Sequence, residues 1–170
     1  MVYDETMPHI HELIDYTTSA FIMHPSEPKI LLLKHKKIGK WLQPGGHIEL
    51  HENPIQALHH ELEEETGLKP KDYEIIEPAD GPKPVGESAS NTVLPLPFYI
   101  NEHFWDGKGP HKHIDICYLA KSKTKKITES PDGASAIDWL TLQQAVSLHE
   151  SNDMYLDTRT IIEWIFDKYM

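Results

Sequence analysis

GHIELHENPIQALHHELEEETGL, residues 46–68, combines a glycine turn, a helix and a cluster of acids in one short segment of a 170-residue chain. Asn53 is a good N-cap, Pro54 suits the first helical position, and Gln56 stands where a capping box needs a glutamine. Gly67 fits the left-handed position that ends a helix. These signals predict a helix between Asn53 and Gly67, preceded by a loop.

The predicted helix carries an unusual concentration of glutamates. Glu61 lies three residues from Glu64 and four from Glu65, which places these three on one face. Glu63 is about 200° around the helix from Glu61 and is expected to point into solvent. Three converging carboxylates suit a hard cation such as Mg²⁺ or Mn²⁺, and Glu52 is close enough in sequence to join them. For such a run taken alone, a solvated acidic helix face is the alternative.

The spacing of these residues resembles the Nudix box. That motif reads G, five residues, E, seven residues, then R-E-apolar-x-E-E-x-G-apolar, and every fixed position from Gly46 to Leu68 matches except one. The exception is His60, which stands where the family has arginine. The segment WLQPGG before the box and a strand ending in DWL near the C-terminus also fit the family's layout. A long match with fixed spacing is a far stronger signal than a short glycine motif.

The resemblance implies an α/β (α+β) fold, an α/β/α sandwich with a mixed β-sheet in which the box forms a loop, a helix and a second loop. It implies a divalent-metal-dependent hydrolase that cleaves the pyrophosphate bond of a nucleoside triphosphate, or of a nucleoside diphosphate linked to another moiety. By position, Glu61, Glu64 and Glu65 would hold Mg²⁺ or Mn²⁺. The Gly46 carbonyl would help them, and Glu52 would be a supporting carboxylate.

His60 is the one departure from the motif. The family's arginine orients the neighbouring glutamates, whereas an unperturbed histidine is mostly charged only below about pH 6.5. Beside several carboxylates, the imidazole of His60 is expected to keep its proton and replace part of the arginine. The alternative is a weaker substitute that slows turnover. The neighbouring His59 is expected to be a plain surface residue.

The composition is that of an acidic globular protein. Sixteen basic residues against 27 acidic ones give a net charge of −11, which repels phosphate backbones and argues against a nucleic-acid polymer as partner. A small nucleotide is still compatible if a cation mediates the contact. Cys117 is the only cysteine, so no disulfide within the chain is expected. Since the sequence shows neither a secretory signal nor a membrane span, no membrane contact and a cytoplasmic location are expected.

The whole chain, 1–170, is expected to form a single domain in which strands interleave with helices. Strands are predicted at 16–24, 29–35, 73–77, 98–105, 113–122 and 137–140, and helices at 142–149 and from about 153 onward. The first two strands form a predicted hairpin, and the run from Pro44 to Gly46 predicts a turn. Residues 78–97 hold five prolines and read as a long loop, for which a lid and a dimer contact both stay open. A monomer and a homodimer are equally compatible with the sequence.

Further candidate site residues lie outside the glutamate cluster. His113 and Asp115 share the polar face of a predicted strand with His111, where they are expected to contact phosphate, ribose or metal. Two histidines and an aspartate can also form a metal site of their own. His47 is a candidate phosphate contact and Trp41 a candidate stacking partner for a base. The alternatives are a structural histidine on an edge strand, an exposed loop histidine, and a core or rim tryptophan.

The catalytic base is the least determined residue. Several Nudix enzymes place a glutamate six residues before a late strand tryptophan, but counting back from Trp139 gives Gly133. Glu129 and Asp132 are nearby substitutes, and two solvated loop acids are the alternative.

Two other functions stay open at this point. The missing arginine and the missing loop glutamate favour a non-catalytic Nudix-like module that binds a nucleotide or regulates a partner. Isomerase chemistry on an isoprenoid diphosphate, which the fold also hosts, would need Cys117 as a reactive cysteine. Turnover of small nucleotides would distinguish a hydrolase from the non-catalytic module. Insensitivity to thiol alkylation would argue against the isomerase.

The substitution His60→Arg tests the orienting role of His60. We expect hydrolysis to be retained or to rise, because arginine supplies a permanent charge and more donors at the same position. Steady-state rates of both proteins on the same nucleotide provide the measurement. Loss of activity in His60→Arg, with an unchanged melting temperature, would rule out an orienting role.

Overall fold

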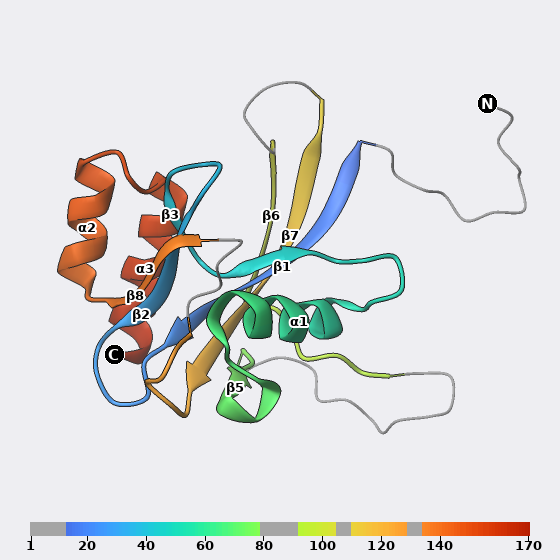
Figure 1. Ribbon diagram of the computed structural model, residues 1–170, viewed down its shortest axis with the longest axis horizontal. Coiled ribbons are helices and arrows are strands. Elements are labelled where there is room, and N and C mark those ends of the chain that lie inside the picture. Colours follow the sequence, from blue (N-terminus) through green and yellow to red (C-terminus); the bar gives the residue numbers. More distant parts are fainter. Residues whose placement is uncertain (1–12, 79–91, 105–109, 129–133) are drawn as a thin grey trace, which may run out of the picture.

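The computed structural model describes residues 13–78, 92–104, 110–128 and 134–170 (Figure 1). Within these ranges the chain forms an eight-stranded sheet and three α-helices. The strands are β1 (Ile14–Met23), β2 (Ile30–His35), β3 (Trp41–Leu42), β4 (Gly45–His47), β5 (Tyr73–Ile76), β6 (Tyr99–Phe104), β7 (Lys112–Ser122) and β8 (Ala134–Leu140). The helices are α1 (Pro54–Thr66), α2 (Leu142–Glu150) and α3 (Leu156–Tyr169), with a short 3₁₀ turn at Pro70–Asp72.

The long strands β1 and β7 form the middle of the sheet and pair in parallel along their whole length. β1 also pairs antiparallel with β2 and β4, and β7 pairs antiparallel with β5 and β6. β2 carries β3 and β8 as further antiparallel neighbours. The predicted hairpin of β1 and β2 and the predicted mixed sheet are therefore both confirmed.

The sheet lies between two helical layers, α1 on one face and α2 with α3 on the other (Figure 1). Ile22 of β1 packs with Leu58 and Leu62 of α1 in one apolar cluster. Its sequence neighbour Phe21 points the other way and packs with Ile165 of α3. All five side chains are fully buried, and each such burial stabilises the fold by about 1.5–3 kcal/mol. The predicted α/β/α sandwich is confirmed.

Helix α1 begins and ends at the predicted residues. The Asn53 side chain accepts hydrogen bonds from the backbone N–H groups of Ile55 and Gln56, both at 3.0 Å. The Gln56 side chain accepts in return from the Asn53 N–H, also at 3.0 Å, which completes the capping box. Gly67 ends the helix with a φ of +73°, the left-handed conformation that favours glycine. The box helix is thus fixed by its own local sequence.

Two sequence-based predictions about the connections are wrong. Gly45 and Gly46 lie in strand β4, paired with β1, instead of forming a turn. Glycine is needed there because a Cβ on Gly45 would lie 2.2 Å from the Thr18 carbonyl oxygen. The last helix starts at Leu156, not near Asp153, because the Asp153 backbone donates to the Leu148 carbonyl and accepts from the Trp41 N–H.

Several predictions concern residues outside the described ranges. These residues are most of the predicted loop 78–97, together with the candidate loop acids Glu129 and Asp132. Among the helices that the structure does describe, none is both long enough and apolar enough to cross a bilayer.

Candidate functional site

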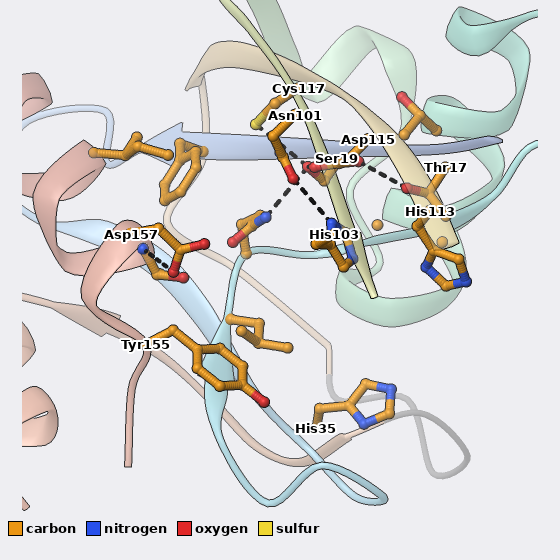
Figure 2. A pocket seen from close by; sticks show the side chains of 18 of the residues that line it. Thr17, Ser19, His35, Asn101, His103, His113, Asp115, Cys117, Tyr155 and Asp157 are labelled. Carbon is orange, nitrogen blue, oxygen red and sulfur yellow. Dashed lines mark hydrogen bonds between the residues drawn. The ribbon is translucent and has the colours of Figure 1, made fainter. Parts of the chain in front are cut away.

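A pocket of about 450 Å³ opens on the α3 side of the sheet, between the strands and that helix (Figure 2). Alternate residues of neighbouring strands form its floor. Thr17 on β1 stands opposite Asp115 on β7 and opposite His47 on β4, and Asn101 on β6 stands on the other side of Asp115. The parallel register of β1 and β7 therefore gathers these polar groups in one place.

Asp115 is the buried centre of the pocket floor, with 4% of its surface exposed. Its carboxylate accepts hydrogen bonds from the hydroxyls of Thr17 at 3.1 Å and Ser19 at 2.7 Å (Figure 2). Burial raises the pKa of Asp115, and these hydrogen bonds oppose the rise. Nearby, the buried Oε1 of Gln43 has no hydrogen-bond partner among the described residues. The floor consequently presents oxygen acceptors to whatever enters the pocket.

Four histidines stand at the outer end of this floor. His113 is 3% exposed, and its ring contacts those of His47, His103 and His111 at centroid distances of 5.0, 5.4 and 5.3 Å. Burial and the neighbouring histidines lower the pKa of His113 to about 4. The His113 imidazole is therefore neutral at neutral pH.

The inner edge of the pocket meets the carboxylates of α1 at the two glycines of β4. Glu65 lines the pocket and accepts a hydrogen bond of 2.9 Å from the Gly45 N–H. Glu61 lies directly over Gly46, since a Cβ added there would be only 2.3 Å from Glu61 Oε1. Only glycine at this position leaves room for that carboxylate, which gives a physical reason for the first fixed residue of the box.

Burial and crowding oppose the ionisation of these acids. Burial raises the pKa of Glu65 to about 7, and the charges of Glu61 and Glu64 add to the rise against the Gly45 hydrogen bond. Burial raises the pKa of Glu61 too, with Glu64 and Glu52 adding to it while His60 lowers it. A nearby cation reverses such shifts, because it favours the ionised form.

His60 lies between two of the acids, as an orienting residue must. Its Nε2 is 2.9 Å from Glu64 Oε1, and its Nδ1 is 3.5 Å from Glu52 Oε1. The hydrogen bond to Glu64 raises the pKa of His60, which favours the charged imidazolium. The Glu52 side chain is only 14% exposed, and its Oε2 is buried with no hydrogen-bond partner in the described part of the chain.

The acids of α1 separate into inner and outer groups. Glu64 is 65% exposed on the solvent side of the helix. Glu63 points away from the cluster, as predicted, and its carboxylate pairs with Lys69 at 3.1 Å. The prediction for His59 is wrong, because its ring is partly buried and contacts the Tyr73 hydroxyl. Glu61 and Glu65 are the members of the helix that reach the glycines.

These residues fit a hard divalent cation. The donors are carboxylate oxygens, and Glu52 holds a buried oxygen with no hydrogen-bond partner among the described residues. Burial, and then the charges of neighbouring glutamates, raise the pKa of Glu61 and of Glu65, and a cation would offset both effects. The ligand atoms of Glu61, Glu64 and Glu65 nevertheless do not all lie within 4.8 Å of one another, so the three converge less tightly than the sequence predicts. Within the described ranges, the only three acid or histidine side chains whose potential ligand atoms lie within 4.8 Å of one another are Asp15, His111 and His113.

Two further candidates are poorly suited to the roles that the sequence suggests. Trp41 packs against the apolar cluster beneath α3 and does not line the pocket. Cys117 is 1% exposed, lies 3.3 Å from the Ser19 hydroxyl oxygen, and burial raises its pKa well above the ordinary value. A thiol that resists ionisation is a poor nucleophile, so the structure argues against chemistry that depends on Cys117.

Sequence reasoning missed Asp15 and Gln43 as site residues. Asp15, Thr17 and Ser19 alternate along β1 and face the pocket side together. That alternation was visible in the segment DYTTS, but its partner strand was not.

Comparisons with known proteins agree with this architecture. A family model described as NUDIX domain matches residues 15–165. A probable DHNTP pyrophosphohydrolase of Lactococcus lactis subsp. cremoris (strain MG1363) is 30% identical over 105 residues, 62% of this chain and 54% of that protein. An RNA pyrophosphohydrolase of Cellvibrio japonicus (strain Ueda107) is 48% identical over 48 residues, 26% of this chain and 28% of that protein. The matched region thus spans about half the length of these curated relatives or less.

A solved structure shows the same fold. The crystal structure of a NUDIX family hydrolase from Clostridium perfringens superposes with a TM-score of 0.69. The two chains are 24% identical, and the similarity covers 90% of this chain and 96% of the other.

The contact between Gly46 and Glu61 predicts how Gly46→Ala behaves. The new Cβ would displace the end of a flexible side chain, so we expect a melting temperature close to wild type and Mn²⁺ affinity at least about tenfold weaker. Gly39→Ala is the matched control: its φ of +74° makes alanine strained, but no atom lies within 4 Å of the added Cβ. It should lower stability and leave Mn²⁺ binding intact. Unchanged Mn²⁺ binding in Gly46→Ala would contradict the assignment.

The raised pKa of Glu65 predicts a pH dependence of folding. The folded protein favours protonated Glu65, so this group's stabilising contribution is present below about pH 4.5 and is lost as the pH rises towards 7. In metal-free buffer, Glu65→Gln should therefore gain in free energy of unfolding relative to wild type from pH 5 to pH 8, by up to about 3 kcal/mol. Urea titrations across this range measure the difference. Glu63→Gln, on the solvent side, should show the same change of unfolding free energy with pH as wild type. The same change in Glu65→Gln would refute the prediction.

Proposed function

This chain belongs to the NUDIX domain family, and from that premise we propose that it is a divalent-metal-dependent hydrolase that cleaves a pyrophosphate bond in a small nucleotide. The substrate class is a nucleoside triphosphate or a nucleoside diphosphate linked to another moiety. We also propose that the 170 residues form a single domain.

The observation that carries this proposal is the meeting of the α1 carboxylates with the β4 glycines at the edge of the pocket. Glu65 bonds to Gly45, and Glu61 lies over Gly46. In the proposal, Glu61 and Glu65 hold Mg²⁺ or Mn²⁺ with help from Glu52, Glu64 and the Gly46 carbonyl. When bound, the cation supplies positive charge that offsets the diphosphate and lowers the pKa of a water molecule.

The chain's own residues would position the reaction. The Gly45 N–H fixes the Glu65 carboxylate, which faces the pocket and is well placed to accept a proton from the attacking water. His60, between Glu52 and Glu64, would orient both through its two ring nitrogens. Outside the described ranges, Glu129 and Asp132 stay as alternative bases.

The pocket would receive the organic part of the substrate. Its volume of about 450 Å³ suits a small molecule, and the acceptors of Asp115 and Gln43 at its floor suit N–H donors such as those of a nucleobase. His47 and His113, at the outer end, would contact the substrate at the pocket mouth. One curated relative is named a probable DHNTP pyrophosphohydrolase, which supports pyrophosphate cleavage as the reaction of this chain.

A small nucleotide suits this chain better than a polymer. Two other curated relatives carry the name RNA pyrophosphohydrolase, but they match only 26% and 34% of this chain. With a net charge of −11 and a single arginine, Arg159, the protein has few positive charges to bind a long phosphate backbone.

One alternative function is a module that binds nucleotides without turning them over. It is favoured by the histidine at position 60, where the family motif has arginine.

A hydrolysis screen with matched variants tests the proposal. With Mg²⁺ or Mn²⁺ and a panel of nucleoside triphosphates, nucleotide sugars, ADP-ribose and dinucleoside polyphosphates, we expect phosphate or pyrophosphate release that EDTA abolishes. Glu61→Gln and Glu65→Gln should lower kcat by at least about 100-fold, because each removes a charge at the reacting centre. Glu63→Gln, which changes an equivalent residue facing Lys69, should retain the wild-type rate.

The outcomes discriminate between the two functions. Thermal melts establish that each variant is folded. Near-normal rates in both Glu61→Gln and Glu65→Gln would remove the mechanism. Nucleotide binding without turnover of any panel member would favour the non-catalytic module.

A further inference from the structure

A second group of potential metal ligands lies at the outer end of the pocket, away from the α1 glutamates. Asp15 on β1 stands directly opposite His113 on β7, and His113 stands directly opposite His103 on β6. His111 precedes β7, and His47 on β4 is paired with Thr17, two residues along β1 from Asp15. Four strands thus bring acid and imidazole groups to one end of the sheet (Figure 2 shows His103 and His113 among them).

The distances within this group are those of a metal site. Asp15, His111 and His113 each offer one ligand atom, and the three atoms all lie within 4.8 Å of one another. His111 Nε2 is 3.1 Å from Asp15 Oδ2, close to the roughly 3.3 Å that separates neighbouring ligands of a tetrahedral Zn²⁺. His47 Nε2 is 3.7 Å from the same Asp15 oxygen, which makes it a further donor close by.

The donor chemistry differs from that of the α1 site. Imidazole nitrogens suit Zn²⁺ and its transition-metal neighbours, whereas Mg²⁺ prefers oxygen ligands alone. His113 is buried against the sheet, while Asp15 and His111 are partly exposed. An ion can therefore reach the group from solvent and find one ligand already held rigidly by the strands.

We propose that Asp15, His111 and His113, with His47 as the adjacent fourth donor, form a binding site for Zn²⁺ or a similar transition-metal ion. The ion would tie the start of β1 to the start of β7 and to β4, at the mouth of the pocket. It would stabilise the folded protein by binding it and not the unfolded chain. This site holds whether or not the chain is a hydrolase, because none of its three main ligands belongs to the α1 cluster.

The competing explanation is a plain ion pair. Asp15 and His111 at 3.1 Å would satisfy each other without any metal, and the neighbouring histidines would then be ordinary wall residues of the pocket. The two explanations differ in whether the protein binds Zn²⁺ at this group when Mg²⁺ is present in excess.

Zinc titration of the metal-free 170-residue chain in excess Mg²⁺ tests the proposal. Magnesium occupies oxygen sites and competes poorly for imidazole, so we expect one equivalent of Zn²⁺ to bind to the wild type by calorimetry and elemental analysis. His111→Gln and His113→Gln should each weaken this binding by at least about tenfold. His149→Gln, which removes an imidazole from α2 far from the cluster, is the matched control and should bind Zn²⁺ like wild type.

Two readouts independent of activity complete the experiment. Zn²⁺ should raise the melting temperature of wild type and His149→Gln but not of His113→Gln. Co²⁺ in place of Zn²⁺ should give visible absorption bands that Glu65→Gln keeps and His113→Gln loses. Absence of a bound equivalent in excess Mg²⁺, or equal Zn²⁺ affinity in wild type and both cluster variants, would overturn the proposal.

Discussion

The close approach of the Glu61 carboxylate to the backbone of Gly46 is the contact on which the candidate site depends. A side chain at Gly46 would displace that carboxylate, so glycine at the first position of the box keeps α1 and β4 in contact at the edge of the pocket. Gly45, beside it, turns its N–H to Glu65 and in turn packs against the Thr18 carbonyl of β1. A helix, an edge strand and the central strand therefore meet at one point. Burial there raises the pKa of both Glu61 and Glu65, which opposes their ionisation.

The unfavourable ionisation of these two carboxylates explains how an acidic protein can bind an anionic ligand. Buried carboxylates beside like charges favour any cation that offsets their charge. A cation held there would also offset the charge of a diphosphate, so a surface with net charge −11 need not repel a small nucleotide at this one place. His60 also adds positive charge at this place, since its hydrogen bond to Glu64 and its contact with the charge of Glu52 favour the imidazolium. The histidine cluster at the other end of the pocket presents nitrogen donors instead, so the two ends differ in the cations they suit.

The sequence predicted correctly those features that depend only on residues close together in the chain. Both ends of α1, its capping box and the outward direction of Glu63 follow from spacing along one helix. The pocket floor does not, because the pairing of Asp15 with His113 and of Thr17 with Asp115 depends on the parallel register of two strands about 100 residues apart in sequence. The exposure of Glu64 and the partial burial of His59 likewise depend on the packing around α1, which helical periodicity alone does not specify.

The central claim is that the α1 carboxylates and the β4 glycines together form a divalent-cation site. Anomalous diffraction from a crystal of the 170-residue chain grown with Mn²⁺ tests it most directly. The account predicts a manganese peak bounded by Glu61, Glu65 and Gly46, with Glu52 turned towards it. A fully ordered α1 with no manganese peak among these residues would contradict it.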